Sequence, residues 1–217
     1  MIVAALTVAA IALAGCGSSS PASAVRRALA RTIAAGTARI AQPGVLDEVV
    51  DFRIPAEQSL SPGEGLTPVG GTIPTYTEDI LCGHSQYLRE VARSPAQEHL
   101  VDPFLTRWRR QGIANTALSP LETEVGGTGG TYRYAGRSSF GGRPVGVYTI
   151  SRPTATFDGM TVVAPRIVVL VDGRGLIVRL SVTQSQYDKA LGSSTRRGTS
   201  TQTFYDFGVK ATIRCPP

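Results

Sequence analysis

Alternating apolar residues over positions 166–183 predict a β-hairpin. A two-residue turn at Gly173 and Arg174 would pair Val171 with Leu176, Val169 with Val178 and Ile167 with Leu180, so that one face is wholly apolar. The other face mixes apolar and polar residues, which is typical of a sheet that is deeply covered on one side only. The apolar face therefore needs a covering element.

The same alternation predicts an antiparallel meander in the last third of the chain, because strand-like segments follow one another there with glycine-rich turns between them. The expected strands are residues 131–140, 143–152, 162–172, 176–185 and 203–214. In the last of these, alternate residues from Tyr205 to Cys215, including Phe207 and Val209, would point to one side. Two shorter strands are expected near the N-terminus, at residues 37–40 and 45–54, around the turn Gln42-Pro43-Gly44.

Apolar residues at helical spacing predict an amphipathic helix over residues 20–36. Val25, Leu29 and Ile33 form its apolar stripe, arginines occupy the opposite side, Ser23 can cap the start and Gly36 the end. The stripe fits either ordinary core packing or a cover for the apolar face of the sheet.

The middle of the chain gives weaker signals. Gly and Pro are dense in residues 59–74, which predicts a long loop, either a lid or a surface excursion. Residues 79–93 fit a strand or a helix. Ser94 and Pro95 fit the start of a helix through Trp108, kinked or split at Pro103. A short helix is expected at residues 116–125, followed by a glycine-rich linker at 126–130.

The N-terminus has the pattern of an export signal. Residues 1–14 carry no charge and are almost entirely apolar, but about 20 residues are needed to span a bilayer. The string Leu13-Ala14-Gly15-Cys16 resembles a bacterial lipobox. This resemblance implies that residues 1–15 are removed and that Cys16 becomes an acylated N-terminus, which would hold the protein at the extracytoplasmic face of the cell membrane. The alternative is an ordinary secretory signal with an incidental cysteine.

Composition and charge fit an exported globular protein. The 217 residues are long enough for one domain, and an apolar content of 42% excludes a disordered chain. The net charge of +6 could indicate a nucleic-acid partner, but export argues against one, and anionic headgroups or cell-wall polymers fit the compartment better.

The cysteine count predicts a disulfide. With Cys16 assigned to lipidation, Cys82 and Cys215 remain as an even pair in an oxidising compartment. The alternative is two separate buried thiols.

Enzyme chemistry has little support in the sequence. The two histidines, His84 and His99, lack metal-ligand spacing, and no glycine pattern around Ser138 and Ser139 marks a nucleophile. Gly173-Arg174-Gly175 precedes no helix and so does not form a phosphate cradle. We therefore expect no catalytic site, no metal and no cofactor.

Several motifs together resemble one family. They are the lipobox, the leading helix that runs into Ala35-Gly36-Thr37-Ala38-Arg39, the segments Tyr134-Ala135-Gly136 and Gly141–Tyr148, the hairpin Val171–Arg179, and the closing Tyr205-Asp206-Phe207-Gly208-Val209. Their order and spacing are similar to those of the LppX/LprG group of actinobacterial lipoproteins, which is related in fold to the LolA lipoprotein carriers. The resemblance implies an α+β fold, in which a strongly curved antiparallel half-barrel holds helices and an apolar cavity on its concave side.

The expected function follows from this resemblance together with the need to shield acyl chains from water. The domain, residues 23–217 behind a lipidated tether of residues 16–22, would act as a monomer. It would bind an acyl-chain lipid, a glycolipid or a lipidated protein and carry it within the envelope. The candidate cavity residues are Leu29, Ile33, Val169, Val171, Val178, Leu180, Phe207 and Val209. Any one of them alone is better explained as ordinary core, and the prediction concerns the group. The alternative is an anchored protein-binding or sensor module whose core is solid.

Overall fold

The structure is a computed structural model that describes residues 20–54, 56–83, 85–112, 120–127, 129–157, 160–188 and 196–217. The predicted signal segment, Cys16, His84 and the expected helical residues 116–119 lie outside these ranges. The helices are α1 (Pro21–Ala34), η1 (Pro95–Leu100, a 3₁₀ helix) and α2 (Pro120–Gly126). The strands are β1 (Thr37–Ala41), β2 (Asp47–Asp51), β3 (Ala56–Leu66), β4 (Thr72–Cys82), β5 (Ser85–Ala92), β6 (Arg109–Gly112), β7 (Thr131–Phe140), β8 (Arg143–Ser151), β9 (Ala155–Phe157), β10 (Met160–Asp172), β11 (Ile177–Asp188) and β12 (Arg196–Tyr205).

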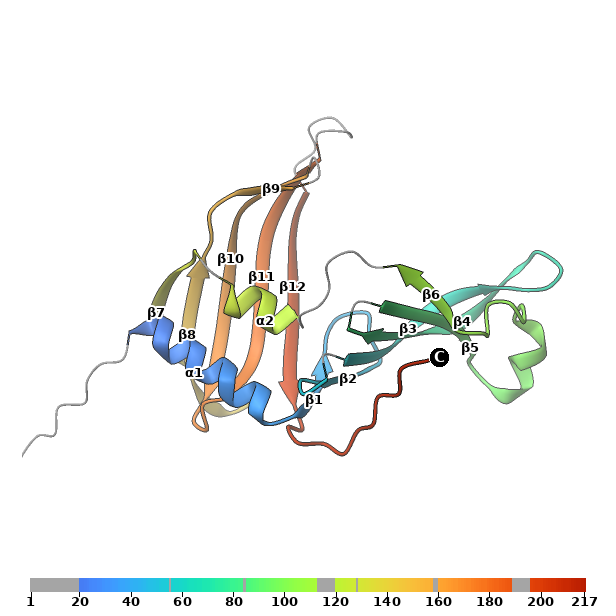
Figure 1. The fold of residues 1–217 in the computed structure, drawn as a ribbon, viewed down its shortest axis with the longest axis horizontal. Helices are drawn as coiled ribbons and strands as arrows, with labels where there is room; N and C mark the ends of the chain where they lie inside the picture. The colour runs from blue at the N-terminus through green and yellow to red at the C-terminus, as the bar shows by residue number, and fades with distance from the viewer. Residues whose placement is uncertain are drawn as a thin grey trace, which may run out of the picture.

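These strands form one open antiparallel sheet (Figure 1). Its order is β6-β5-β4-β3-β2-β1-β12-β11-β10-β8-β7, and β9 pairs with β10. Helices α1 and α2 lie across one face of the part formed by β7 to β12, whereas β1 to β6 extend beyond them. The predicted α+β class, with an open antiparallel sheet and few helices, is therefore confirmed.

Helix α1 begins one turn earlier than the predicted cap. Ser20 is the N-cap, its side chain accepts a hydrogen bond from the Ser23 backbone nitrogen at 3.2 Å, and Pro21 takes the first helical position. The helix ends at Ala34 with Ala35 as its C-cap, and Gly36 follows with a φ of +84°, which favours glycine. The predicted apolar stripe is confirmed, since Val25 is buried against the sheet.

The predicted register of the β10–β11 hairpin is wrong. Val169 lies opposite Leu180 and Ile167 opposite Val182, which moves the pairing by two residues. The turn is longer than predicted because the Asp172 side chain organises it: its Oδ1 accepts hydrogen bonds from the backbone nitrogens of Arg174 and Leu176. The register also shifts between Leu170 and Val171, where Val178 is the extra residue of a β-bulge.

The bulge creates a contact between α1 and the sheet. The Ile177 backbone nitrogen donates to Thr32 Oγ1 at 2.9 Å, and the same hydroxyl donates to the Ala28 carbonyl at 2.8 Å. Both bonds are buried, and Thr32 and Ile177 are 145 residues apart in the chain. A buried backbone group at the start of β11 is therefore satisfied by the helix that covers the sheet.

The predicted last strand is wrong in position. Strand β12 covers residues 196–205, and residues 206–217 are not part of the sheet. The change of direction begins at Asp206, which has a φ of +48°, and at Gly208, which has a φ of +78°. Alternation beyond Tyr205 therefore did not indicate a strand, although Phe207 still packs against the main core.

The predicted loop at residues 59–74 is a β-hairpin. Strands β3 and β4 pair without a break from Ala56 with Cys82 to Leu66 with Thr72. Gly63 and Gly65 lie beside threonine side chains of β4, and a Cβ added to Gly63 would come within 2.5 Å of Thr77 Oγ1. The glycines thus make room for neighbouring side chains inside a strand and do not mark a loop.

The other predictions for the middle of the chain are correct only in part. Residues 79–93 belong to strands β4 and β5, so the strand alternative is the correct one. The helix predicted from Ser94 is confirmed only as η1, which ends at Leu100, and Trp108 lies outside any helix. Pro103 cannot donate a backbone hydrogen bond, which fits an end of the helix before it.

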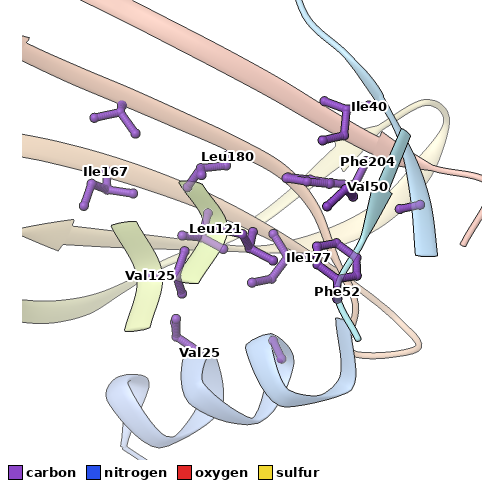
Figure 2. Packing of buried hydrophobic residues seen from close by; sticks show 14 of the residues in the cluster. Val25, Ile40, Val50, Phe52, Leu121, Val125, Ile167, Ile177, Leu180 and Phe204 are labelled. Carbon is purple, nitrogen blue, oxygen red and sulfur yellow. The ribbon is translucent and has the colours of Figure 1, made fainter. Parts of the chain in front are cut away.

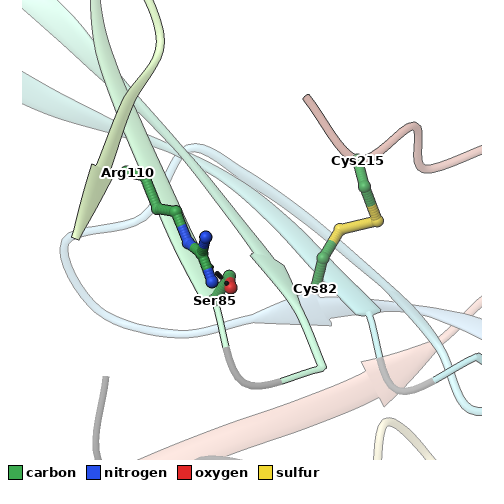
Figure 3. The surroundings of a disulfide bond; sticks show 4 residues. All are labelled: Cys82, Ser85, Arg110 and Cys215. Atoms are coloured by element: carbon green, nitrogen blue, oxygen red, sulfur yellow. Dashed lines mark hydrogen bonds between the residues drawn. A yellow bond between two sulfur atoms is a disulfide. The ribbon is translucent and has the colours of Figure 1, made fainter. Parts of the chain in front are cut away.

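The C-terminal segment, residues 206–217, crosses to the other half of the sheet. There Ile213 packs with Ala56 and Ile80 in a second, smaller core. A disulfide joins Cys82 at the end of β4 to Cys215, close to Ser85 and Arg110 (Figure 3). The predicted disulfide is therefore present. Cys215, however, is an exposed residue of the C-terminal segment and does not lie on the buried face of a strand, as predicted.

We expect Gly63→Ala to destabilise the protein by about 1–3 kcal/mol. The new methyl group would displace the Thr77 hydroxyl, which hydrogen-bonds to Glu90 Oε1 at 3.1 Å. Gly198 in β12 is a matched control, because no atom of the described residues lies within 4 Å of the position its Cβ would take. Denaturant unfolding of both variants measures the difference, and an equal cost for Gly198→Ala would contradict the packing explanation.

We expect Cys82→Ser to lower the free energy of unfolding by up to about 5 kcal/mol, because the disulfide closes a long loop. The two cysteines are 133 residues apart in the chain. Denaturant unfolding of the wild type with and without a reductant, beside the variant in both conditions, is the measurement. A reductant that affects the variant as strongly as the wild type would show that the effect does not come from this bond.

Candidate functional site

The main apolar core lies between the sheet and the two helices that cover it (Figure 2). Val25 from α1 and Leu121 and Val125 from α2 point towards β10 and β11, where they meet Ile167 and Ile177 among others. These side chains are almost completely buried. The candidate site is therefore the layer between the helices and the sheet.

The structure brings most of the predicted cavity residues into this layer. Val169 and Leu180 belong to the buried core with exposed fractions of 0% and 2%. The half-buried residues that pack against this core include Leu29, Ile33, Val171 and Phe207. Their proximity to one another is a finding, whereas a role in ligand binding stays a prediction.

Two members of the predicted set lie apart from this core. Val178 is the extra residue of the bulge and is half-buried. The Val209 carbonyl accepts a hydrogen bond from Thr37 Oγ1 at 2.6 Å, and the residue lines a surface hollow of about 420 Å³ with Arg53 and Lys210. The first difference follows from the bulge, which breaks the alternation between Val178 and Leu180, and the second from the early end of β12.

Helix α2 is a short cover that polar contacts hold at its C-terminal end. Tyr132 Oη donates to the Val125 carbonyl at 3.1 Å, and Arg152 Nη2 donates to the Glu124 carbonyl at 2.6 Å. Burial raises the pKa of the Glu124 carboxyl, and the nearby charge of Arg152 opposes this change. Tyr132 of β7 and Arg152, the residue after β8, thus bind carbonyl groups that the end of a helix leaves without partners.

The residues that hold α2 were not predicted from the sequence. Tyr132 lies near the start of the correctly predicted strand β7. Arg152 was predicted as the last residue of a strand but follows the end of β8, and neither residue belongs to a motif. The helical pattern before Val125 indicated α2 itself, and the glycine-rich linker indicated that the chain turns back to the sheet. A contact between an arginine and a carbonyl 28 residues away leaves no periodic signal.

The side chains on the helix-covered face of the sheet change from apolar to acidic at β2. Val50 and Glu48 lie on the same face because they are two residues apart in one strand, and the pairing of Val50 with Glu57 and of Ser59 with Asp79 extends this face across β3 and β4. We call Glu48, Glu57 and Asp79 the acidic patch. An apolar half and an acidic half thus share one face of the sheet.

Glu48 is the most deeply buried member of the acidic patch, with an exposed fraction of 0%. Its Oε2 accepts a hydrogen bond from Gln42 Nε2 at 2.6 Å, while no donor among the described residues reaches Oε1. The neighbouring Glu57 carboxyl can share a hydrogen bond with Glu48 only if one of the two holds a proton.

The pKa values of all three carboxyls in the acidic patch are raised. Burial, followed by the charge of Glu57, raises the pKa of Glu48 to about 8. Burial also raises the pKa of Glu57, and it raises the pKa of Asp79, where the hydrogen bond from Gln86 opposes the change. One proton is therefore retained between Glu48 and Glu57 at neutral pH.

Other site classes find no support in the part of the chain that the structure describes. Within it, no three His, Cys, Asp or Glu side chains are placed to hold a metal ion. No helix in the same ranges is long and apolar enough to cross a membrane.

We expect the free energy of unfolding to fall as the pH rises from about 4.5 to about 8, since the folded pKa of Glu48 lies above its unfolded value. Between these two pH values the folded state holds a proton that the unfolded state has released, and one such proton lowers the free energy of unfolding by up to about 1.4 kcal/mol per pH unit. Glu48→Gln keeps an uncharged side chain and should flatten this slope, while the exposed Glu64→Gln should not. Urea unfolding across the interval is the measurement, and equal slopes in wild type and Glu48→Gln would refute the assignment.

The comparisons with known proteins concern the fold. No family model matches the chain, and no curated protein matches it in sequence. Among solved structures, the lipoprotein LppX of Mycobacterium tuberculosis aligns at 13% identity with a TM-score of 0.51, covering 89% of this chain and 98% of its own. LprF of Mycobacterium bovis aligns at 11% identity with a TM-score of 0.47, covering 90% of this chain and 96% of its own.

The likeness to LppX extends over nearly the whole of both chains, so it includes the open sheet and the helices that cover it. At this low identity, it concerns the fold and not the residues of a site. The predicted resemblance to the LppX/LprG lipoproteins is therefore confirmed at the level of the fold.

Proposed function

We propose that the chain is an exported lipoprotein that binds acyl chains between its helices and its open sheet and carries them within the cell envelope. In this proposal, residues 1–15 are the signal peptide, Cys16 is the lipidated anchor and residues 23–217 form the binding domain. The bound molecule is a lipid, a glycolipid or a lipidated protein.

The observation that carries the proposal is that the short helix α2 covers part of the apolar face of the sheet. Helix α2 has seven residues, and it shields the apolar face of the sheet with two large side chains, Leu121 and Val125. A helix of this length is not stable by itself in water, so its position depends on contacts with the rest of the protein. Tyr132 and Arg152 bind carbonyl groups at its C-terminal end.

An acyl chain could replace the contacts that α2 provides. Movement of α2 would uncover Ile150 and Ile167 on the sheet and Val25 on α1, all of which are completely buried. Each methylene group that enters this layer recovers about 0.8 kcal/mol of apolar burial. A lipid tail of ordinary length could thus compensate for the displaced side chains.

The second candidate is an anchored protein-binding or sensor module with a solid core. The near-complete burial of Val169 and Leu180 favours it, because a water-sized space beside these residues would leave part of their surface accessible. The two candidates differ in one respect, which is whether the layer between helices and sheet opens to admit a ligand.

Lipid that co-purifies with the protein tests the proposal. We expect an organic extract of the natively purified protein to contain a lipid detectable by mass spectrometry. Leu29→Trp should reduce it about tenfold, because Leu29 is half-buried and lies against Gly126 at the end of α2. Leu46→Trp is the matched control, since Leu46 is 58% exposed and belongs to the turn between β1 and β2.

The thermal midpoint of each variant separates loss of binding from loss of folding. If the wild-type extract contains no lipid and Leu29→Trp only destabilises the protein, by the roughly 1–3 kcal/mol typical of overpacking, the solid-core module replaces the carrier.

A further inference from the structure

The charges at the beginning of the chain have one sign only. Residues 1–46 contain no Asp or Glu, and their four charged residues are Arg26, Arg27, Arg31 and Arg39. The first acidic residue, Asp47, forms an ion pair with Arg39 at 2.7 Å. The other three arginines all belong to α1.

The fold places these three arginines on the outer side of α1. Val25, Ala28 and Thr32 are buried, which fixes the opposite side of the helix towards solvent. Arg26, Arg27 and Arg31 are exposed there, and we call them the basic helix face. The exposed residues between them are small, Ser23 and Ala30, so a flat surface can approach the guanidinium groups closely.

A fourth arginine lies beside the basic helix face. Arg31 Nη1 donates to the carbonyl of Arg174, in the turn between β10 and β11, at 3.3 Å. The Arg174 side chain is paired with Asp172 at 2.9 Å, so this turn adds little net charge to the surface beside the helix.

The N-terminus of α1 is also the point at which the domain joins its expected anchor. Four peptide units separate Cys16 from the N-cap Ser20, and even a fully extended chain of that length spans only about 14 Å. The potential of an anionic lipid surface falls off over about 10 Å at moderate ionic strength. A lipid on Cys16 would therefore hold α1 within or near this range.

We propose that the basic helix face binds anionic phospholipid headgroups and lays α1 along the membrane surface. The inference deepens the proposed function and rests on it for the position of the anchor. Its consequence is that the boundary between α1 and α2, where Leu29 meets Gly126, is held near the lipid that the protein would take up or deliver. The planar guanidinium group suits phosphate oxygens because it can donate two parallel hydrogen bonds.

The binding of protein with Cys16→Ser to vesicles tests the proposal without the acyl anchor. The measured quantity is the ratio of partition into equimolar phosphatidylglycerol and phosphatidylcholine over partition into phosphatidylcholine alone, so any apolar insertion of the N-terminal residues cancels. The triple variant R26Q/R27Q/R31Q removes the basic helix face. The control R107Q/R110Q/R214Q removes the same charge from exposed arginines near β6 and in the C-terminal segment, away from α1 (Figure 1).

We expect the ratio to fall on the order of a hundredfold in the helix variant, because each arginine near an anionic surface contributes about a factor of five. The control triple should change it by less than about threefold, and R26K/R27K/R31K should keep most of the wild-type ratio. Added salt should lower the wild-type ratio.

Three results would overturn the inference: a wild-type ratio near one, an equal loss in both triple variants, or stronger binding to a soluble polyanion than to vesicles. The last would assign the face to an anionic polymer. Acylation of Cys16 is measured separately, from the mass of the N-terminal peptide of the protein that keeps this cysteine. Failure of the anchor and failure of the basic helix face are therefore distinguishable.

Discussion

The hydrogen bond between Thr32 and the Ile177 amide is the contact on which the covered face depends. A bulge in an antiparallel sheet leaves a backbone group without its ladder partner, and a buried group of this kind costs about 1–3 kcal/mol if nothing binds it. Here the partner is a helix side chain from the other end of the sequence. The position of α1 and the irregularity of β11 therefore require each other, and α2 packs on the surface that they define together.

The sequence predicted the parts of the fold that repeat. Strand alternation located β7, β8, β10 and β11, and helical spacing located α1, since burial on one side imposes these periods. The failures have local causes. The hairpin register depended on the Asp172 side chain, which lengthens the turn, and the strandlike pattern after Tyr205 continued past a residue with positive φ. Neither feature changes the apolar pattern.

The β3–β4 hairpin was missed for a related reason. Gly and Pro in a strand are read as breaks, but Gly63 and Gly65 serve the packing of threonines from the neighbouring strand. The site shows the same limit. Val169 and Leu180 could be selected from their alternation, whereas the contacts that hold α2 and the raised pKa values of Glu48 and Glu57 arise from tertiary neighbours. A sequence read for periodicity contains no information on them.

The C-terminal segment limits how this protein can deform. It leaves β12 in the helix-covered half, packs Ile213 on the far side of the other half and ends in a covalent bond to β4. Bending of the sheet about β1 would have to stretch or detach this connection. This connection therefore resists bending of the sheet. Movement of the short helix α2 on its surface breaks no such connection and costs less free energy.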